Sequence, residues 1–321
     1  MLVSLHLKTE FIIIIIFVLV IFLQEYIVDT SNIIERFITS FSQFCLIIFG
    51  SLKQFKTKEE ENKEKKFGLV GLIYLLSTII LNFIVFYLTN ILDEKELYGL
   101  DLFLPIICFF ILEKIVFKQK IYSHHILSMI INFFIILFLI YLLNSENTKL
   151  SIFIYAFFLS YVYAFYTLLI KFFNVYYNIN IYFIASLIGL IEMIYHIGFI
   201  NKVMKEFKEI KLLSFLLLTV INFVYHFLYY FIIWKLGPIH SSISECIAYV
   251  IIFFFDFELS DFLFFLPWML LSIFSAFIYL NIIELKFCGL NKYHMILRKE
   301  KKRKIEGQNL KIYHEFNEKG N

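Results

Sequence analysis

The chain has 321 residues, of which 61% are hydrophobic and 17% charged, and its formal net charge is +3 at pH 7. Its mean hydropathy is +0.81. A water-soluble protein needs more polar surface than this composition can supply, so a soluble globular protein is excluded and a membrane protein is predicted.

Ten apolar stretches follow one another along the chain and are separated by short polar breaks. A helix needs about 20 residues to cross a bilayer core of ~30 Å. The stretches are long and uninterrupted, unlike the alternating strands of a membrane barrel, so an all-α fold is predicted. The predicted spans cover residues 11–28, 34–52, 67–92, 102–117, 121–143, 150–173, 179–200, 212–234, 238–256 and 262–284. Charged residues shorten the uninterrupted apolar length of the second and fourth spans. If one of these two spans lay on the membrane surface, nine membrane-crossing spans would remain.

Lysine and arginine residues indicate the orientation of the chain. With an even number of spans, the two termini lie on the same side of the membrane. The breaks and termini on that side contain 22 of the 29 lysine and arginine residues. Loops on the cytoplasmic side are enriched in these residues, so both termini are predicted to be cytosolic. Residues 290–321 are predicted to be a basic cytosolic tail, and residues 201–211 an amphipathic segment on the other side. The predicted location is an endomembrane (Golgi, endoplasmic reticulum or vesicle) or the plasma membrane.

The ten spans divide into two halves of five, residues 1–145 and 146–289. An odd number of spans in each half means that the second half is inverted relative to the first. The longest charged break follows the second span of each half. The fourth span of each half carries a proline followed about two turns later by a glutamate, Pro105 with Glu113 and Pro238 with Glu245. Proline-interrupted spans at matching places of inverted repeats are typical of a transporter's central site.

Polar residues inside the predicted spans are the candidates for function, because an ionisable group at membrane depth needs a partner, water or a purpose. Glu192 and His196 are one helical turn apart and therefore share a face. Asn222 and His226 repeat that spacing in the eighth span. The predicted substrate-binding residues are Glu192, His196, Asn222, Tyr225, His226, Ser242 and Glu245 in the second half, with Tyr163 in the sixth span and Asn82 in the third.

Each of these candidates also has a purely structural interpretation. Glu192 and His196 could form a buried pair that holds two helices together. Asn222 and His226 could join helices by hydrogen bonds. The serines around Ser242 suit close helix packing, and in a chain with 21 tyrosines Tyr163 could simply pack.

Catalytic signatures are missing from the sequence. The eight histidines are too scattered for a di-iron site, and the four cysteines show no zinc or disulfide spacing. Neither a glycine-rich phosphate loop nor Gly-x-Ser-x-Gly occurs. The prediction is therefore a protein that is not an enzyme, with no catalytic residues, metal or cofactor. A membrane-embedded enzyme stays as an alternative, because His196, His226 and His240 could bind zinc if the fold brought them together.

Two segments, EKIVFKQKIYSHHIL at residues 113–127 and IIELKFCGLN at residues 282–291, and the Gly237–Pro238 region carry a family resemblance. Over these segments the chain resembles members of the drug/metabolite transporter superfamily from unicellular eukaryotes. These members are EamA-like and are related to the nucleotide-sugar transporters. The resemblance implies ten helices in inverted five-helix repeats that alternate access around a central cavity. Tyr176-Tyr177-Asn178 only partly matches the Phe-Tyr-Asn-Asn element of nucleotide-sugar transporters, and their Gly-Ala-Leu-Asn-Lys element is absent.

The sequence thus predicts a multi-pass solute carrier for a small polar metabolite, which could be nucleotide-linked, with the lipid bilayer as its surroundings and no nucleic-acid partner. A homodimer is a further expectation. Glu192 and His196 would couple protons to transport, since a carboxylate and an imidazole at that depth can change charge between states. The alternative from another class is a non-transporting membrane subunit of an organellar complex.

Overall fold

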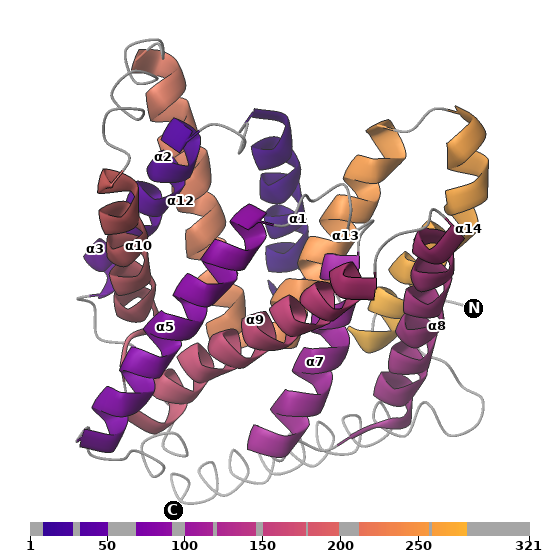
Figure 1. Cartoon of the computed structure of the whole chain (residues 1–321), viewed down its shortest axis with the longest axis horizontal. Coiled ribbons are helices and arrows are strands. Elements are labelled where there is room, and N and C mark those ends of the chain that lie inside the picture. The colour runs from indigo at the N-terminus through magenta and orange to yellow at the C-terminus, as the bar shows by residue number, and fades with distance from the viewer. Residues whose placement is uncertain are drawn as a thin grey trace, which may run out of the picture.

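A computed structural model describes residues 9–27, 33–50, 69–91, 100–117, 121–145, 150–177, 179–198, 212–256 and 259–280. These residues form helices joined by turns and short connections, with no strand among them (Figure 1). The predicted all-α class is therefore confirmed for this part of the chain. The charged break at 53–66, the predicted amphipathic segment 201–211 and the predicted tail 290–321 lie outside the described residues.

The helices follow the predicted spans closely. Their bounds are α1 Thr9–Ile27, α2 Ile33–Phe44, α3 Ile47–Gly50, α5 Leu69–Ile91, α7 Leu100–Phe117, α8 Ser123–Ser145, α9 Leu150–Tyr177, α10 Ile181–Ile197, α12 Leu212–Lys235, α13 Pro238–Asp256 and α14 Leu259–Tyr279. The second predicted span differs, because a turn at Cys45 and Leu46 divides it into α2 and α3.

Several of these helices are compatible with a membrane. Three are long and apolar enough to cross one by length and composition, over Ser123–Tyr141, Phe153–Tyr177 and Leu213–Lys235. Shorter apolar stretches lie in α1, α2 with α3, α5, α10, α13 and α14. Large apolar side chains also point outward, such as Leu69, which is 74% exposed, and Leu213, which is 78% exposed. A surface this apolar suits lipid better than water.

Figure 1 shows α2, α10 and α12 together at one side of the molecule and α8 with α14 at the other, while α9 crosses obliquely between them. Helix α9 packs against α5 and α7, and α1 packs against α12 and α13. Helix α8 packs on α7, and α14 packs on α13. Three further pairs, α2 with α10, α7 with α13 and α8 with α14, join the first half of the chain to the second.

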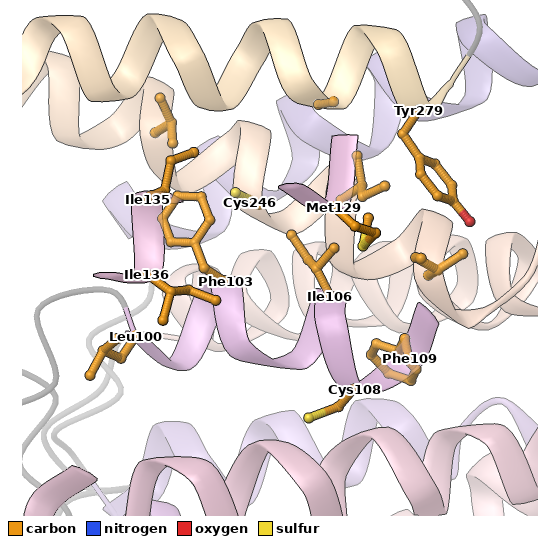
Figure 2. Packing of buried hydrophobic residues seen from close by; sticks show 14 of the residues in the cluster. Leu100, Phe103, Ile106, Cys108, Phe109, Met129, Ile135, Ile136, Cys246 and Tyr279 are labelled. Carbon is orange, nitrogen blue, oxygen red and sulfur yellow. The ribbon is translucent and has the colours of Figure 1, made fainter. Parts of the chain in front are cut away.

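Two apolar clusters form the core of the bundle. The first lies among α7, α8, α13 and α14, where Phe103, Ile106 and Phe109 of α7 point toward residues of the neighbouring helices (Figure 2). The second joins α1, α9, α10 and α12. Tyr163 of α9 packs against both clusters. The middle of α9 is therefore the place where the two cores meet.

A glycine allows α2 and α10 to approach closely. A Cβ atom added at Gly189 would lie 2.6 Å from the backbone nitrogen of Phe44 and 2.8 Å from the carbonyl oxygen of Ser40. Asn180 fixes the start of α10, because its side-chain oxygen accepts a hydrogen bond from the Tyr182 amide at 2.9 Å and its amide donates to the Phe49 carbonyl at 2.9 Å. Gly189 thus allows α10 to pack closely on α2, and the Asn180 cap joins the start of α10 to α3.

Candidate functional site

Glu245 of α13 is the centre of a cluster of tyrosines. The Tyr225 hydroxyl donates a hydrogen bond to its Oε1 at 2.9 Å, and the Tyr163 hydroxyl donates to its Oε2 at 3.3 Å. The Tyr163 and Tyr229 hydroxyls are 2.7 Å apart and share a further hydrogen bond. Three of the predicted site residues, Tyr163, Tyr225 and Glu245, therefore meet although they come from α9, α12 and α13.

Aromatic rings surround this carboxylate. The rings of Phe17 and Tyr225 stack with centroids 5.6 Å apart, and those of Phe109 and Tyr163 meet edge to face at 5.6 Å. The Tyr225 and Tyr229 rings also stack, at 6.1 Å. Helices α1 and α7 thus add a phenylalanine each to the cluster, which has an apolar wall and one acidic group.

The turn between α12 and α13 puts Tyr225 and Glu245 opposite each other. Helix α12 ends at Lys235, and the Gly237 amide donates back to the Ile232 carbonyl at 3.0 Å. Gly237 has φ +121, a conformation that L side chains rarely adopt, and Pro238 begins α13. This tight reversal brings the middle of α12 next to the middle of α13.

The three polar residues keep some accessible surface in spite of their central position. Tyr163, Tyr225 and Glu245 are partly buried, whereas Tyr229 is fully buried. Tyr163 and Tyr225 lie near the middle of α9 and α12, far from the helix ends.

Glu192 of α10 lies in a second polar cluster. Its Oε2 accepts a hydrogen bond from the Ser40 hydroxyl of α2 at 3.2 Å. It lies within electrostatic range of the Tyr166 and Tyr230 hydroxyls, and Tyr230 accepts a hydrogen bond from the Gln43 amide at 2.9 Å. Tyr166 is also within electrostatic range of Glu245. The Tyr166 hydroxyl is therefore within electrostatic range of both carboxylates.

His196 is buried on the face of α10 that packs against α2. Its ring lies 6.5 Å from that of Phe37 and 5.6 Å from that of Tyr195. Glu192 and His196 thus face the same neighbouring helix, as the one-turn spacing predicts. Their role in coupling protons to transport stays a prediction.

Asn222 joins three helices and is fully buried. Its side-chain oxygen accepts hydrogen bonds from the Gln24 amide of α1 at 3.1 Å and from the Thr39 hydroxyl of α2 at 3.2 Å. Its amide donates to the Leu218 carbonyl at 2.9 Å. These contacts favour the structural interpretation of Asn222 over substrate contact.

Of the remaining candidates, His226 lies beside the Glu245 cluster. The His226 ring lies 5.1 Å from that of Tyr225, and no described residue hydrogen-bonds to its Nε2. Ser242 is buried in α13. Asn82 belongs to α5, but its side chain lies outside the described residues.

Sequence reasoning missed three residues of the cluster, Tyr229, Phe17 and Phe109. Tyr229 follows Tyr225 by one turn, so the helical spacing already put both on one face of α12. Phe17 is one of 42 phenylalanines and carries no signal of its own. Across the described ranges, no group of three or more His, Cys, Asp or Glu side chains could hold a metal ion. The three histidines of the zinc alternative therefore do not form such a group.

No protein-family model matches the chain, and no curated protein matches its sequence.

Proposed function

We propose that the protein is a multi-pass carrier of a small polar metabolite, built from two inverted five-helix repeats at residues 1–145 and 146–289. Both ends would lie in the cytosol, and the membrane would be an endomembrane or the plasma membrane. The Glu245 cluster would be the substrate site and would be reached alternately from the two sides. This assignment agrees with the resemblance to the drug/metabolite transporter superfamily.

The pairing of helices carries the proposal. The first half supplies α1, α2 with α3, α5, α7 and α8, and their counterparts in order are α9, α10, α12, α13 and α14. If each helix is exchanged for its counterpart, the pair α7–α9 becomes α13–α1, α5–α9 becomes α12–α1, and α7–α8 becomes α13–α14. All of these pairs occur, and α2–α10, α7–α13 and α8–α14 map onto themselves. Such exchange is expected of two related bundles packed about a pseudo-twofold axis.

Not every pair follows the exchange: among the described residues α12 packs on α13, whereas α5 does not pack on α7 to a similar degree. The largest departure is at α2 and α12, and it suits a carrier. Helices α2 and α12 pack along each other through Ile34, Ile38 and Leu218. Their counterparts, α10 and α5, touch only slightly. Two repeats that adopt different conformations would close one end of the path and open the other, as alternating access requires.

Cross-linking of the closed pair tests the proposal. Ile38→Cys and Leu218→Cys would be introduced into a chain whose four native cysteines are replaced, and the protein reconstituted into liposomes. The liposomes would be exposed to a mixture of amines, amino acids, sugars, nucleotides and vitamins, and their contents measured by mass spectrometry. We expect at least one compound to accumulate, to stop accumulating after oxidation, and to recover after reduction.

A cysteine pair between α8 and α14 is the matched control. The Ser128 and Ser275 hydroxyl oxygens lie 2.9 Å apart at this interface, and neither serine belongs to the Glu245 cluster. Cross-linking cysteines there should leave uptake intact. Absence of uptake for every compound, or uptake that continues after the α2–α12 cross-link, would contradict the carrier function.

A further inference from the structure

We infer that the Glu245 cluster takes an organic ammonium compound, a small cation with apolar substituents, as its ligand. This inference deepens the proposed function, on which it rests for the transport of that ligand. It follows from the sign of the charge at the site and from the groups that surround it.

The carboxylate of Glu245 has no fixed cation in the described part of the chain. Its hydrogen-bond partners there are the hydroxyls of Tyr225 and Tyr163. The ion pair of Lys171 is made instead with Glu113, at 3.3 Å. A buried carboxyl group is either protonated or paired with a positive charge, because an isolated charge is poorly solvated inside a protein. No described residue supplies that charge to Glu245, so a cationic ligand would pair with its ionised form.

The walls of the site suit an organic cation. Aromatic faces attract a cation through their quadrupole, and tyrosine and phenylalanine rings are the usual walls of ammonium sites. Phe17, Tyr225 and Tyr229 stack beside the carboxylate, and Phe109 and Tyr163 meet edge to face on another side. A carboxylate with such walls favours an ammonium group with apolar substituents over a small, strongly hydrated metal ion.

The same features disfavour a phosphate or nucleotide ligand. Phosphate sites use arginine, lysine or several backbone amides. The groups that act electrostatically on Tyr163, Tyr225 and Tyr229 within the described residues are Glu245 and other tyrosines, with no lysine or arginine among them. An anion placed here would meet a carboxylate in surroundings of low polarity. A nucleotide-linked substrate is therefore disfavoured at this cluster.

Binding to the purified full-length protein in nanodiscs tests the inference. The probes are choline and phenethylammonium, with their neutral counterparts 3,3-dimethylbutan-1-ol and 2-phenylethanol and with uridine monophosphate as an anion. Affinities would be measured by calorimetry. We expect at least one ammonium probe to bind on the order of tenfold or more tightly than its neutral counterpart, and the nucleotide not to bind.

Variants assign the binding to this cluster. Glu245→Gln should remove the preference for ammonium over the neutral counterpart, and Tyr163→Leu should weaken binding of the ammonium probe severalfold. Tyr161→Leu is the matched control, because Tyr161 lies on the same helix but is 45% exposed; it should bind as the unmodified protein does. Thermal unfolding of each variant shows whether it is folded.

The outcomes separate this inference from the carrier function. Equal binding of charged and neutral probes, a preference for ammonium that survives Glu245→Gln, tighter binding of the nucleotide, or no binding of either ammonium probe would overturn the inference. Uptake of a neutral or anionic compound in the liposome assay, without ammonium binding, would leave the carrier function standing and reject the inference. Ammonium binding without uptake of any compound would do the reverse.

Discussion

The Lys171 ammonium group of α9 lies 3.3 Å from the Glu113 carboxylate of α7, and the two side chains are only 14% and 3% exposed. The α12–α13 turn passes directly over this ion pair, because a Cβ atom added at Gly237 would lie 2.8 Å from both Glu113 Oε1 and Lys171 Nζ. Three segments that are distant in sequence are thus joined at one buried pair of charges.

Loss of one partner of this pair should destabilise the protein. Glu113→Gln leaves the lysine charge buried without a counter-ion, and we expect the free energy of unfolding to fall by about 2–3 kcal/mol. The double variant Glu113→Gln/Lys171→Met should recover most of that loss, because neither charge remains. Unfolding in sodium dodecyl sulfate measures both, with Lys235→Met on the exposed end of α12 as control. If the double variant lost as much unfolding free energy as Glu113→Gln and Lys171→Met lose when added together, the two charges would act independently.

Gly237→Ala should also destabilise the protein, by about 1–3 kcal/mol. The new methyl group would need a left-handed conformation at φ +121 and would press against both members of the ion pair. Gly198→Ala is the matched control: Gly198 has φ −58, and among the described residues its added Cβ would meet only the Tyr195 carbonyl, at 3.2 Å. Melting temperatures of the two variants measure the difference, and equal values would contradict the assigned role of Gly237.

Asn222 and Tyr225 should separate stability from ligand affinity. Asn222→Ala removes hydrogen bonds that join α1, α2 and α12, so it should lower the free energy of unfolding by about 1–2 kcal/mol and leave ligand affinity unchanged. Tyr225→Phe removes the hydroxyl that donates to Glu245 but keeps the ring, so it should change affinity more than stability. Paired measurements of unfolding and of the apparent KM for uptake test this; a large affinity change in Asn222→Ala would restore it as a site residue.

Glu192 carries the prediction about coupling to protons. If it titrates during transport, Glu192→Gln should make uptake into proteoliposomes independent of pH, because the glutamine cannot change charge. Ser40→Ala serves as a comparison, since it removes the hydroxyl that donates to Glu192 Oε2 at 3.2 Å but keeps the carboxylate. An unchanged pH dependence in Glu192→Gln would reject the coupling role.

Much of the helical architecture follows from the sequence. The bounds of α12 and α13 agree with the predicted spans almost residue for residue, because apolar runs and the Gly237–Pro238 stop are local signals. The turn at Cys45 and Leu46 was not predicted, since nothing in the composition of that run distinguishes a broken helix from a continuous one. The position of Tyr163, Tyr225 and Glu245 inside apolar runs was enough to make them candidate site residues, without any knowledge of their contacts.

By itself, the sequence determined that the chain is helical and apolar, and which rare polar groups lie inside its helices, because these properties depend on residues close together in the chain. Only the tertiary structure decided which of those groups meet. The Gln24–Asn222 hydrogen bond joins residues 198 positions apart, and Tyr163 reaches Glu245 across 82. Packing between distant helices, governed by side-chain shape and close approach, made Asn222 a structural link and put Phe17 and Tyr229 in the Glu245 cluster.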